Sequence, residues 1–245
     1  MSTAQDNAFS TNEACAALKG LGDGKLKFVL NTHWHGDHTG GNAEFGREAP
    51  IVAHTNVRKR LAAGQSVLGR KVDPAPKAAL PVITFDDHLS VHFNGEEIRV
   101  LHPAPAHTDG DSVIFFTGSN VVHLGDLFFA GRFPFVDLDS GGDVEGLIAD
   151  IRELLPKLPA GAKLIPGHGP LSTAADLQTY LGMLETTIGI VRSRIAADKN
   201  LEQIQAEGLP DEWKSWGSGF INTAKWLEIV HRSLTRGKAA ASPNP

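Results

Sequence analysis

The hydrophobic positions of the chain follow two patterns, which predict short strands in its first two thirds and longer helices towards its end. Short apolar runs bounded by polar or glycine-rich segments are typical of strands, and they occur at residues 26–31, 51–53, 81–85, 113–116, 120–124 and from 162 onwards. Residues 89–93 alternate between apolar and polar and meet residues 98–100 across Asn94-Gly95, a dipeptide that favours a tight hairpin turn.

Apolar residues at helical spacing predict several helices. The clearest covers residues 143–155 and ends at Pro156, and a second apolar stripe begins after Ala174 and packs into the core. Weaker patterns predict helices at 11–20, 54–61 and around 220–230. We expect residues 1–236 to form one domain with a helical C-terminal part, and residues 237–245, which are rich in Ala, Ser and Pro, to form a disordered tail.

Composition narrows the classes of protein that fit. The chain has 245 residues, of which 41% are hydrophobic and 21% charged, enough for a packed core. A net charge of −5 argues against nucleic-acid binding through a basic surface, and no apolar run is long enough to predict a membrane span. Cys15 is the single cysteine, so no intrachain disulfide can form. Residues 1–10 do not resemble a signal peptide. The sequence does not determine the cellular compartment, and a periplasmic location is compatible with it if the natural start lies upstream.

The candidate chemistry is concentrated in Asn31-Thr32-His33-Trp34-His35-Gly36-Asp37-His38, where four potential metal ligands fall within six positions. The stretch lies between a predicted strand and a helix expected to open near Thr39, so backbone curvature can direct several side chains to one point. Imidazole and carboxylate suit zinc, and a set without thiolate is typical of an open, catalytic site. We expect His33 and His35 to share one metal and Asp37 and His38 to reach a second. The alternative, a solvated histidine-rich loop, is disfavoured by this context.

The pattern His-x-His-x-Asp-His after a strand resembles the signature of the metallo-β-lactamase-fold hydrolase superfamily. Three later blocks match the family in the expected order: Ala106-His107-Thr108, Gly125-Asp126-Leu127 and Gly167-His168-Gly169. The resemblance covers roughly residues 6–235 and implies an α/β (α+β) fold, an αββα sandwich of two mixed β-sheets flanked by helices. Family members have several strands before the first motif, so this chain is expected to lack N-terminal strands, as a truncated or misassigned start would produce.

The resemblance also implies a ligand set. His33, His35 and His107 would hold the first metal, Asp37, His38 and His168 the second, and Asp126 would bridge them. An aspartate at position 126, in place of the cysteine or serine of the true β-lactamases, is similar to the thioesterase (glyoxalase II) and lactonase branches. Asp6 would support the ligand loop from behind and His123 would hydrogen-bond nearby. Loops 64–79 and 130–142 are the predicted pocket walls.

The resulting prediction is a dinuclear zinc hydrolase acting on a small-molecule ester, thioester, lactone or amide, with weak β-lactam turnover also open. Two Zn²⁺ per chain are expected, Fe or Mn being alternatives, and hydroxide between the two ions would be the nucleophile. Asp37 would orient the nucleophile or pass a proton. Two other interpretations remain: an iron-dependent oxidoreductase similar to sulfur dioxygenases, and a truncated chain that binds metal without activity. A homo-oligomer is also compatible with the sequence.

Overall fold

The computed structural model describes residue 20 and residues 25–239, and the chain divides into two compact units, one ending at Asp86 and one starting at Asp87. The predicted helix at 11–20 and the candidate Asp6 lie outside the described residues, apart from Gly20. The expectation of a single domain over residues 1–236 stays a prediction.

The N-terminal unit contains a three-stranded sheet in the order β1-β2-β5, and its described strands run parallel. Strand β2 (Ile51–His54) lies in the middle and is buried along its whole length, as expected for a central parallel strand. Strand β1 (Val29–Leu30) is shorter and more exposed than the buried strand predicted over 26–31, because it lies at the edge of the sheet. Strand β5 (Ile83–Phe85) forms the other edge.

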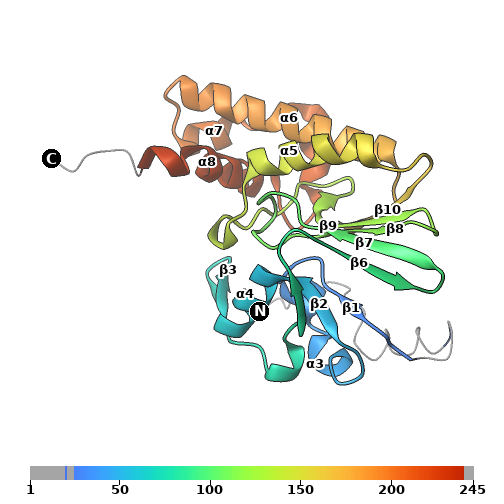
Figure 1. The fold of residues 1–245 in the computed structure, drawn as a ribbon. Helices are drawn as coiled ribbons and strands as arrows, with labels where there is room; N and C mark the ends of the chain where they lie inside the picture. The colour runs from blue at the N-terminus through green and yellow to red at the C-terminus, as the bar shows by residue number, and fades with distance from the viewer. Residues whose placement is uncertain (1–19, 21–24, 240–245) are drawn as a thin grey trace. The chain divides into compact units, whose positions relative to one another are not determined.

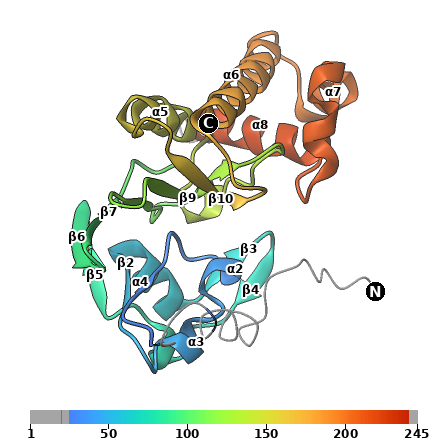
Figure 2. The ribbon, with the colours of Figure 1, turned by 90° about the vertical axis from the view of Figure 1, so that its right-hand side faces the viewer.

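The described part of the N-terminal unit also contains the helices α2 (Gly36–Thr39), α3 (Asn42–Phe45) and α4 (Thr55–Ala63) (Figure 2). Trp34, Ala53, Val57 and Leu61 form the core between α4 and the sheet. The predicted loop 64–79 contains a short antiparallel hairpin, β3 (Gln65–Val67) and β4 (Arg70–Val72). The apolar pattern did not predict this hairpin, because β3 is at most half-buried, β4 is exposed, and neither strand alternates between apolar and polar residues over a useful length.

The C-terminal unit is built on a five-stranded mixed sheet in the order β10-β9-β8-β7-β6. Its strands are β6 (His88–Phe93), β7 (Glu96–Leu101), β8 (Val113–Phe116), β9 (Val121–Phe129) and β10 (Lys163–His168). Only β9 and β10 pair in parallel. The predicted hairpin is confirmed: β6 and β7 pair antiparallel, and Asn94 and Gly95 both have the positive φ that a type I′ turn requires.

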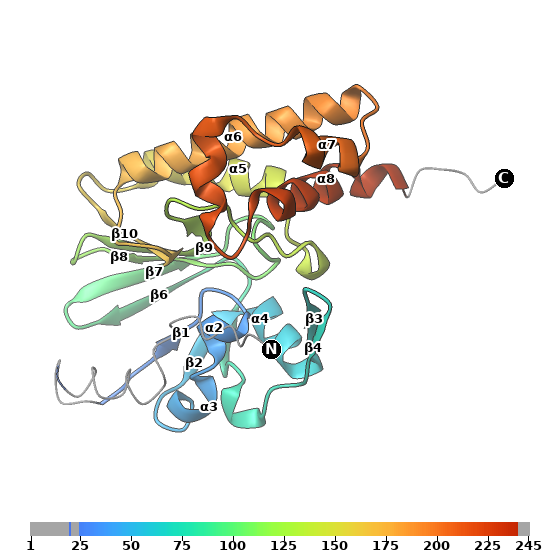
Figure 3. The ribbon, with the colours of Figure 1, turned by 180° about the vertical axis from the view of Figure 1, so that it is seen from behind.

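Four helices cover one face of this sheet (Figures 1 and 3): α5 (Val144–Leu154), α6 (Ala174–Ala196), α7 (Leu201–Glu207) and α8 (Thr223–Ala239). Asp143 caps the N-terminus of α5: its Oδ1 atom accepts hydrogen bonds from the backbone of Glu145 and Gly146. Fully buried aromatic residues join strand to helix, with the rings of Phe128 and Tyr180 5.2 Å apart. Helix α8 extends three residues into the segment predicted to be a disordered tail; residues 240–245 lie outside the described part.

The predicted class, an α/β chain with sheets flanked by helices, is confirmed. Among the described residues, no helix combines the length and the apolar character that a membrane crossing needs.

Candidate metal centre

In the N-terminal unit, the first motif occupies the turn from β1 into α2. The helix begins at Gly36, three residues earlier than predicted, so Asp37 and His38 lie in its first turn. His33 and His35 are buried, whereas the side chain of Asp37 is 47% exposed. The ring of His33 lies 4.9 Å from that of His35 and 4.1 Å from that of His38. The three imidazoles of the motif therefore gather at one point.

A pair of buried amides holds this turn in place. Nδ2 of Asn31 donates to Oδ1 of Asn42 at 3.1 Å, and Nδ2 of Asn42 donates back to Oδ1 of Asn31 at 2.9 Å. Asn42 also donates to the carbonyl of Ala79. Because the reciprocal pair joins the residue directly after β1 to the first residue of α3, it sets the curvature of the ligand turn.

The turn is also fixed from inside the unit. The hydroxyl of Thr39 donates to the carbonyls of Trp34 and His35, at 3.2 and 3.0 Å. The indole of Trp34 is 2% exposed and packs in the core, so the two histidines that flank it in sequence are presented from a rigid base. The part played by Trp34 was not predicted, although a large apolar residue between two polar ones is a signal for it.

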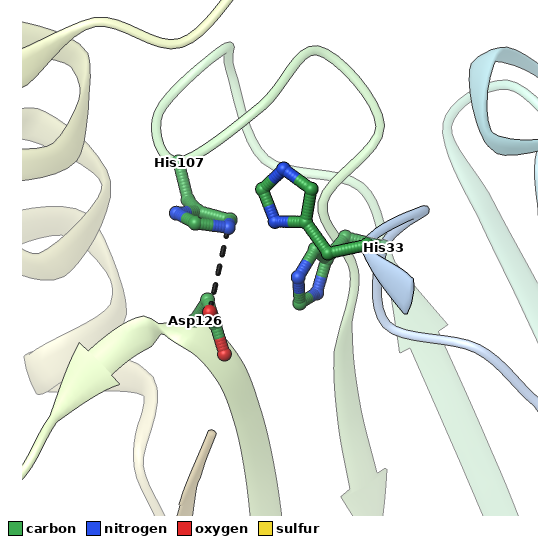
Figure 4. Close-up of side chains that lie close together, drawn as sticks. His33, His107 and Asp126 are labelled. Atoms are coloured by element: carbon green, nitrogen blue, oxygen red, sulfur yellow. Dashed lines mark ion pairs between the residues drawn. The ribbon is translucent and has the colours of Figure 1, made fainter. Parts of the chain in front are cut away.

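In the C-terminal unit, two histidines face one carboxylate. Nε2 of His107 lies 3.4 Å from Oδ2 of Asp126 (Figure 4). Nε2 of His168 lies 3.4 Å from the same oxygen. His107 and Asp126 are buried, at 0% and 5% exposed, while His168 is half-buried. The three residues come from the loop after β7, the interior of β9 and the end of β10.

The tautomer of His107 follows from its other ring nitrogen. Nδ1 lies 2.7 Å from the backbone oxygen of Phe135, and since a carbonyl only accepts, Nδ1 carries a proton. In the neutral ring, Nε2 then presents a lone pair towards Asp126. Metal-binding histidines commonly have this arrangement, in which a backbone carbonyl orients the ring. The Phe135 contact could not be predicted from the sequence, because it is made by a main-chain oxygen.

Pairing of β9 with β10 positions the second histidine. His168 is in register with Phe129, their rings stack at 4.8 Å, and the amide of Ala130 donates to the carbonyl of His168. A methyl group placed on Gly167 would lie 1.9 Å from Oδ1 of Asp126, so only glycine leaves room for that carboxylate. The residues present thus fit a cation: neutral imidazoles and a carboxylate, in a space kept open by glycine.

The remaining candidates have structural contacts. Asp111 accepts from the backbone and hydroxyl of Thr108, at 2.8 and 2.6 Å, and so closes the turn that carries His107. Burial raises the pKa of Asp111 to about 8, although the Thr108 hydrogen bonds act in the opposite direction. His123 accepts from the backbone of Gly125, one residue before Asp126. His54 accepts from the backbone of Asn56 at the start of α4.

The seven predicted ligands therefore fall into two sets. His33, His35, Asp37 and His38 lie in the N-terminal unit, and His107, Asp126 and His168 lie in the C-terminal unit. Each set brings side chains of the metal-binding type together within its own unit.

Comparison with known proteins identifies the class. Residues 2–173 match the metallo-beta-lactamase superfamily, and the chain belongs to this family. It is similar to hydroxyacylglutathione hydrolases, with 29% identity over 198 residues to the one from Anaeromyxobacter dehalogenans, covering 80% of this chain and 67% of that protein. The one from Pelagibacter ubique is 29% identical over 162 residues, covering 64% of this chain and 58% of that protein. The chain therefore spans only about half to two thirds of such relatives.

Solved structures agree on the fold. The B3 metallo-beta-lactamase BLEG-1 superposes with a TM-score of 0.59 at 25% identity, covering 73% of this chain and 86% of that one. The metallo-beta-lactamase from Pontibacter korlensis also gives 0.59, at 20% identity, over 71% of this chain and 76% of that one. The predicted superfamily is thus confirmed.

Proposed function

We propose that the two sets of ligands join in one dinuclear zinc centre and that the chain is a hydrolase of an acyl ester or thioester. The observation that carries the proposal is the pair of Nε2 atoms, from His107 and His168, each 3.4 Å from one oxygen of Asp126. With Nδ1 of His107 protonated, its Nε2 lone pair and the carboxylate repel each other unless Nε2 is also protonated or a cation lies between them.

The residues divide the work as follows. His33, His35 and His107 would hold one ion, and Asp37, His38 and His168 the other, with Asp126 shared between them. Two bound metal ions would lower the pKa of a water molecule shared between them towards roughly 7 and would polarise the substrate carbonyl. Asp37 is the half-exposed carboxylate of the set, so it can take a proton from the attacking water and release it to solvent or to the leaving group.

The substrate class is inferred from the ligand set and from the relatives. Aspartate at position 126 leaves no thiolate in either set, and the relatives named hydroxyacylglutathione hydrolases act, by their name, on an acyl group carried by a thiol peptide. We therefore favour a thioester over an ester, and both over lactones and amides. β-Lactam turnover, if present, is expected to be weak.

The test is metal analysis combined with a substrate panel. The purified full chain, reconstituted with zinc, is expected to hold two ions by mass spectrometry and to hydrolyse a hydroxyacylglutathione faster than a lactone or a β-lactam. Bound iron with oxygen consumption would support the oxidoreductase alternative. Two bound ions without turnover of any acyl substrate would support the inactive alternative.

A matched pair of variants separates ligand loss from general damage. His168→Ala removes a proposed ligand and should leave one ion per chain. His92→Ala removes an exposed histidine on β6 and should leave both. If both variants retain two ions, the assignment of His168 is wrong.

A further inference from the structure

The loop that carries His107 is held by a later segment of the chain, residues 135–146. Nδ1 of His107 donates to the carbonyl of Phe135 at 2.7 Å, and the amide of Asp137 donates to the carbonyl of His107 at 2.9 Å. The segment therefore holds both the ring and the backbone of this proposed ligand. Residues 106–109 lie between β7 and β8, outside any helix or strand, so their position depends on such contacts.

Two glycines let this segment lie directly against the loop. A methyl group placed on Gly142 would lie 2.4 Å from the carbonyl oxygen of His107, and one placed on Gly146 would lie 2.1 Å from the carbonyl oxygen of Pro105. Neither glycine has a positive φ, so what matters here is the missing side chain, which allows two backbones to approach. A displacement of the segment is therefore transmitted to the loop, because the two backbones are in contact.

Asp143 joins this segment to helix α8. Its amide donates to the carbonyl of Ala106, the residue before His107, at 2.7 Å. Its Oδ1 atom caps α5, and its Oδ2 atom accepts from two side chains of α8, Oγ of Ser233 at 3.3 Å and Nη2 of Arg236 at 3.0 Å. Asp143 thus contacts the His107 loop through its backbone and the C-terminal helix through its carboxylate.

The two residues of α8 make further contacts with the same segment. Nη1 of Arg236 donates to the carbonyl of Leu138 at 3.1 Å, so one guanidinium joins two points of the segment. Oγ of Ser233, which is buried, accepts from the amide of Val144 at 3.3 Å. A planar guanidinium with two acceptors fixes their relative position more strictly than a single hydrogen bond does.

Helix α8 is a rigid base for these contacts. Trp226 and Leu227 are completely buried, and Nε1 of Trp226 donates to the hydroxyl of Thr187 on α6 at 3.0 Å. Asp126, the carboxylate that His107 faces, lies on strand β9 and is held separately (Figure 4). The separation between His107 and Asp126 therefore depends on how the segment is held against α8.

We propose that Asp143 is a positioning residue for His107, and that Ser233 and Arg236 of α8 keep it in place. The inference rests on the proposed function only in taking His107 as a ligand of the first ion. It assigns to the C-terminal helix a part in the affinity for that ion, although α8 supplies none of the proposed ligands. Loss of the contact between α8 and Asp143 should let the ring of His107 move relative to Asp126 and weaken zinc binding.

The test follows the Nδ1 proton of His107 by NMR in zinc-free protein that contains isotope-labelled histidine. His107→Gln assigns the signal by its absence. In Arg236→Gln, and in Asp143→Asn, which keeps an oxygen to cap α5 but loses the carboxylate, this proton should exchange with solvent roughly threefold to tenfold faster than in the wild type. This range is expected when partly exposed hydrogen bonds to a charged group are lost.

Zinc affinity is measured in the same proteins by competition with a chelator. It should fall by a similar factor in Arg236→Gln and Asp143→Asn, less than the roughly 10–100-fold typical of a group that bonds a ligand directly. Arg236→Lys should recover part of both effects, because it keeps the charge but not the planar pair of donors. The double variant should bind zinc little more weakly than the poorer single variant, since both substitutions break the same contact.

Two controls separate positioning from general damage. Arg152→Gln removes an exposed arginine that pairs with Glu185 between α5 and α6, and it should change neither proton exchange nor zinc affinity. The ring signals of His168, which lies at the end of β10, should be the same in every variant. Unchanged exchange of the His107 proton in both variants of the α8 contact overturns the proposal. So does an equal loss of zinc affinity in Arg152→Gln, or a wild-type proton that exchanges too fast to be observed.

Failure of the proposed function can be distinguished from failure of this inference. If the wild type binds no zinc, the proposed function fails, but proton exchange still decides whether α8 positions His107. If zinc binds and exchange is unchanged in the variants, only this inference fails. If Asp143→Asn does not fold, Arg236→Gln and Arg236→Lys decide, because the side chain of Arg236 is 45% exposed and its replacement leaves the core intact.

Discussion

Nε2 of His107 lies 3.4 Å from Oδ2 of Asp126, while Nδ1 of the same ring donates to the carbonyl of Phe135. The contact with Phe135 determines the chemical nature of the contact with Asp126. Because the proton is on Nδ1, the pair consists of two acceptors unless Nε2 is also protonated or a cation intervenes. Metal binding at this pair should therefore compete with protons and weaken as the pH falls.

The first prediction concerns the charge of the shared carboxylate. Asp126→Asn keeps the shape of the side chain but removes its charge, so zinc bound per chain should fall from two ions to one or none. Zinc affinity should drop by at least the roughly 10–100-fold seen when only a supporting group is lost. Equilibrium dialysis followed by mass spectrometry measures both quantities. Two ions retained at unchanged affinity would mean that Asp126 is not a ligand.

The second prediction concerns the space beside that carboxylate. Gly167→Ala would place a methyl carbon 1.9 Å from Oδ1 of Asp126, so the carboxylate must move. We expect roughly a 100-fold loss in kcat/KM, the effect typical of a displacement of about 1 Å at a reacting centre. Gly182→Ala on α6 is the matched control: its methyl group meets nothing within 4 Å, and it should stabilise the helix by about 0.5–1 kcal/mol without changing activity. Equal activity in both variants would contradict the geometry.

The residues of the candidate site could be proposed from the sequence because the chemistry of the site depends on the types of its side chains. Histidine and aspartate at short spacing are rare outside functional sites, and the glycines on each side of His168 indicate close approach of the backbone. The hairpin at Asn94-Gly95 was equally predictable, since its turn is determined by two adjacent residues. In these cases, residues close together in the sequence determine the local structure.

Other features depend on contacts between distant parts of the chain. The orientation of His107 depends on the main-chain oxygen of Phe135, 28 residues away. Every residue type has such an oxygen, so the sequence does not indicate this contact. The hairpin of β3 and β4 is held by backbone pairing between largely exposed residues, so apolar periodicity could not reveal it.

The third prediction tests the amide pair that shapes the first ligand turn. Asn42→Ala leaves the buried amide of Asn31 without its reciprocal partner and should reduce the free energy of unfolding by about 1–3 kcal/mol. Asn31→Ala should behave similarly, and the double variant should cost less than the sum of the two. Urea unfolding of the four proteins gives the coupling energy. Strict additivity would show that the two amides do not act together.

The last prediction uses a buried carboxylate away from both ligand sets. Asp150 lies on α5, is 7% exposed, and its Oδ2 atom has no hydrogen-bond partner among the described residues. Burial raises the pKa of Asp150 to about 7, Glu153 adds to the increase, and a hydrogen bond from the backbone of Ala104 opposes it. The folded protein therefore keeps a proton on Asp150 at pH values where the unfolded chain has lost it.

The sign of the effect follows from this difference in proton binding. The contribution of protonated Asp150 to stability is fully present below about pH 4 and is lost as the pH rises through 7. The side chain in Asp150→Asn stays neutral at every pH. At pH 8 the free energy of unfolding of this variant should therefore be about 1–3 kcal/mol larger than that of the wild type, and at pH 5 the difference should be much smaller. Urea unfolding in excess zinc at both pH values measures this. Asp211→Asn is the control: Asp211 is exposed, and its hydrogen bond to Lys214 lowers its pKa, so its effect should be the same at pH 5 and 8. A difference for Asp150→Asn that does not grow with pH would show that Asp150 is already ionised in the fold.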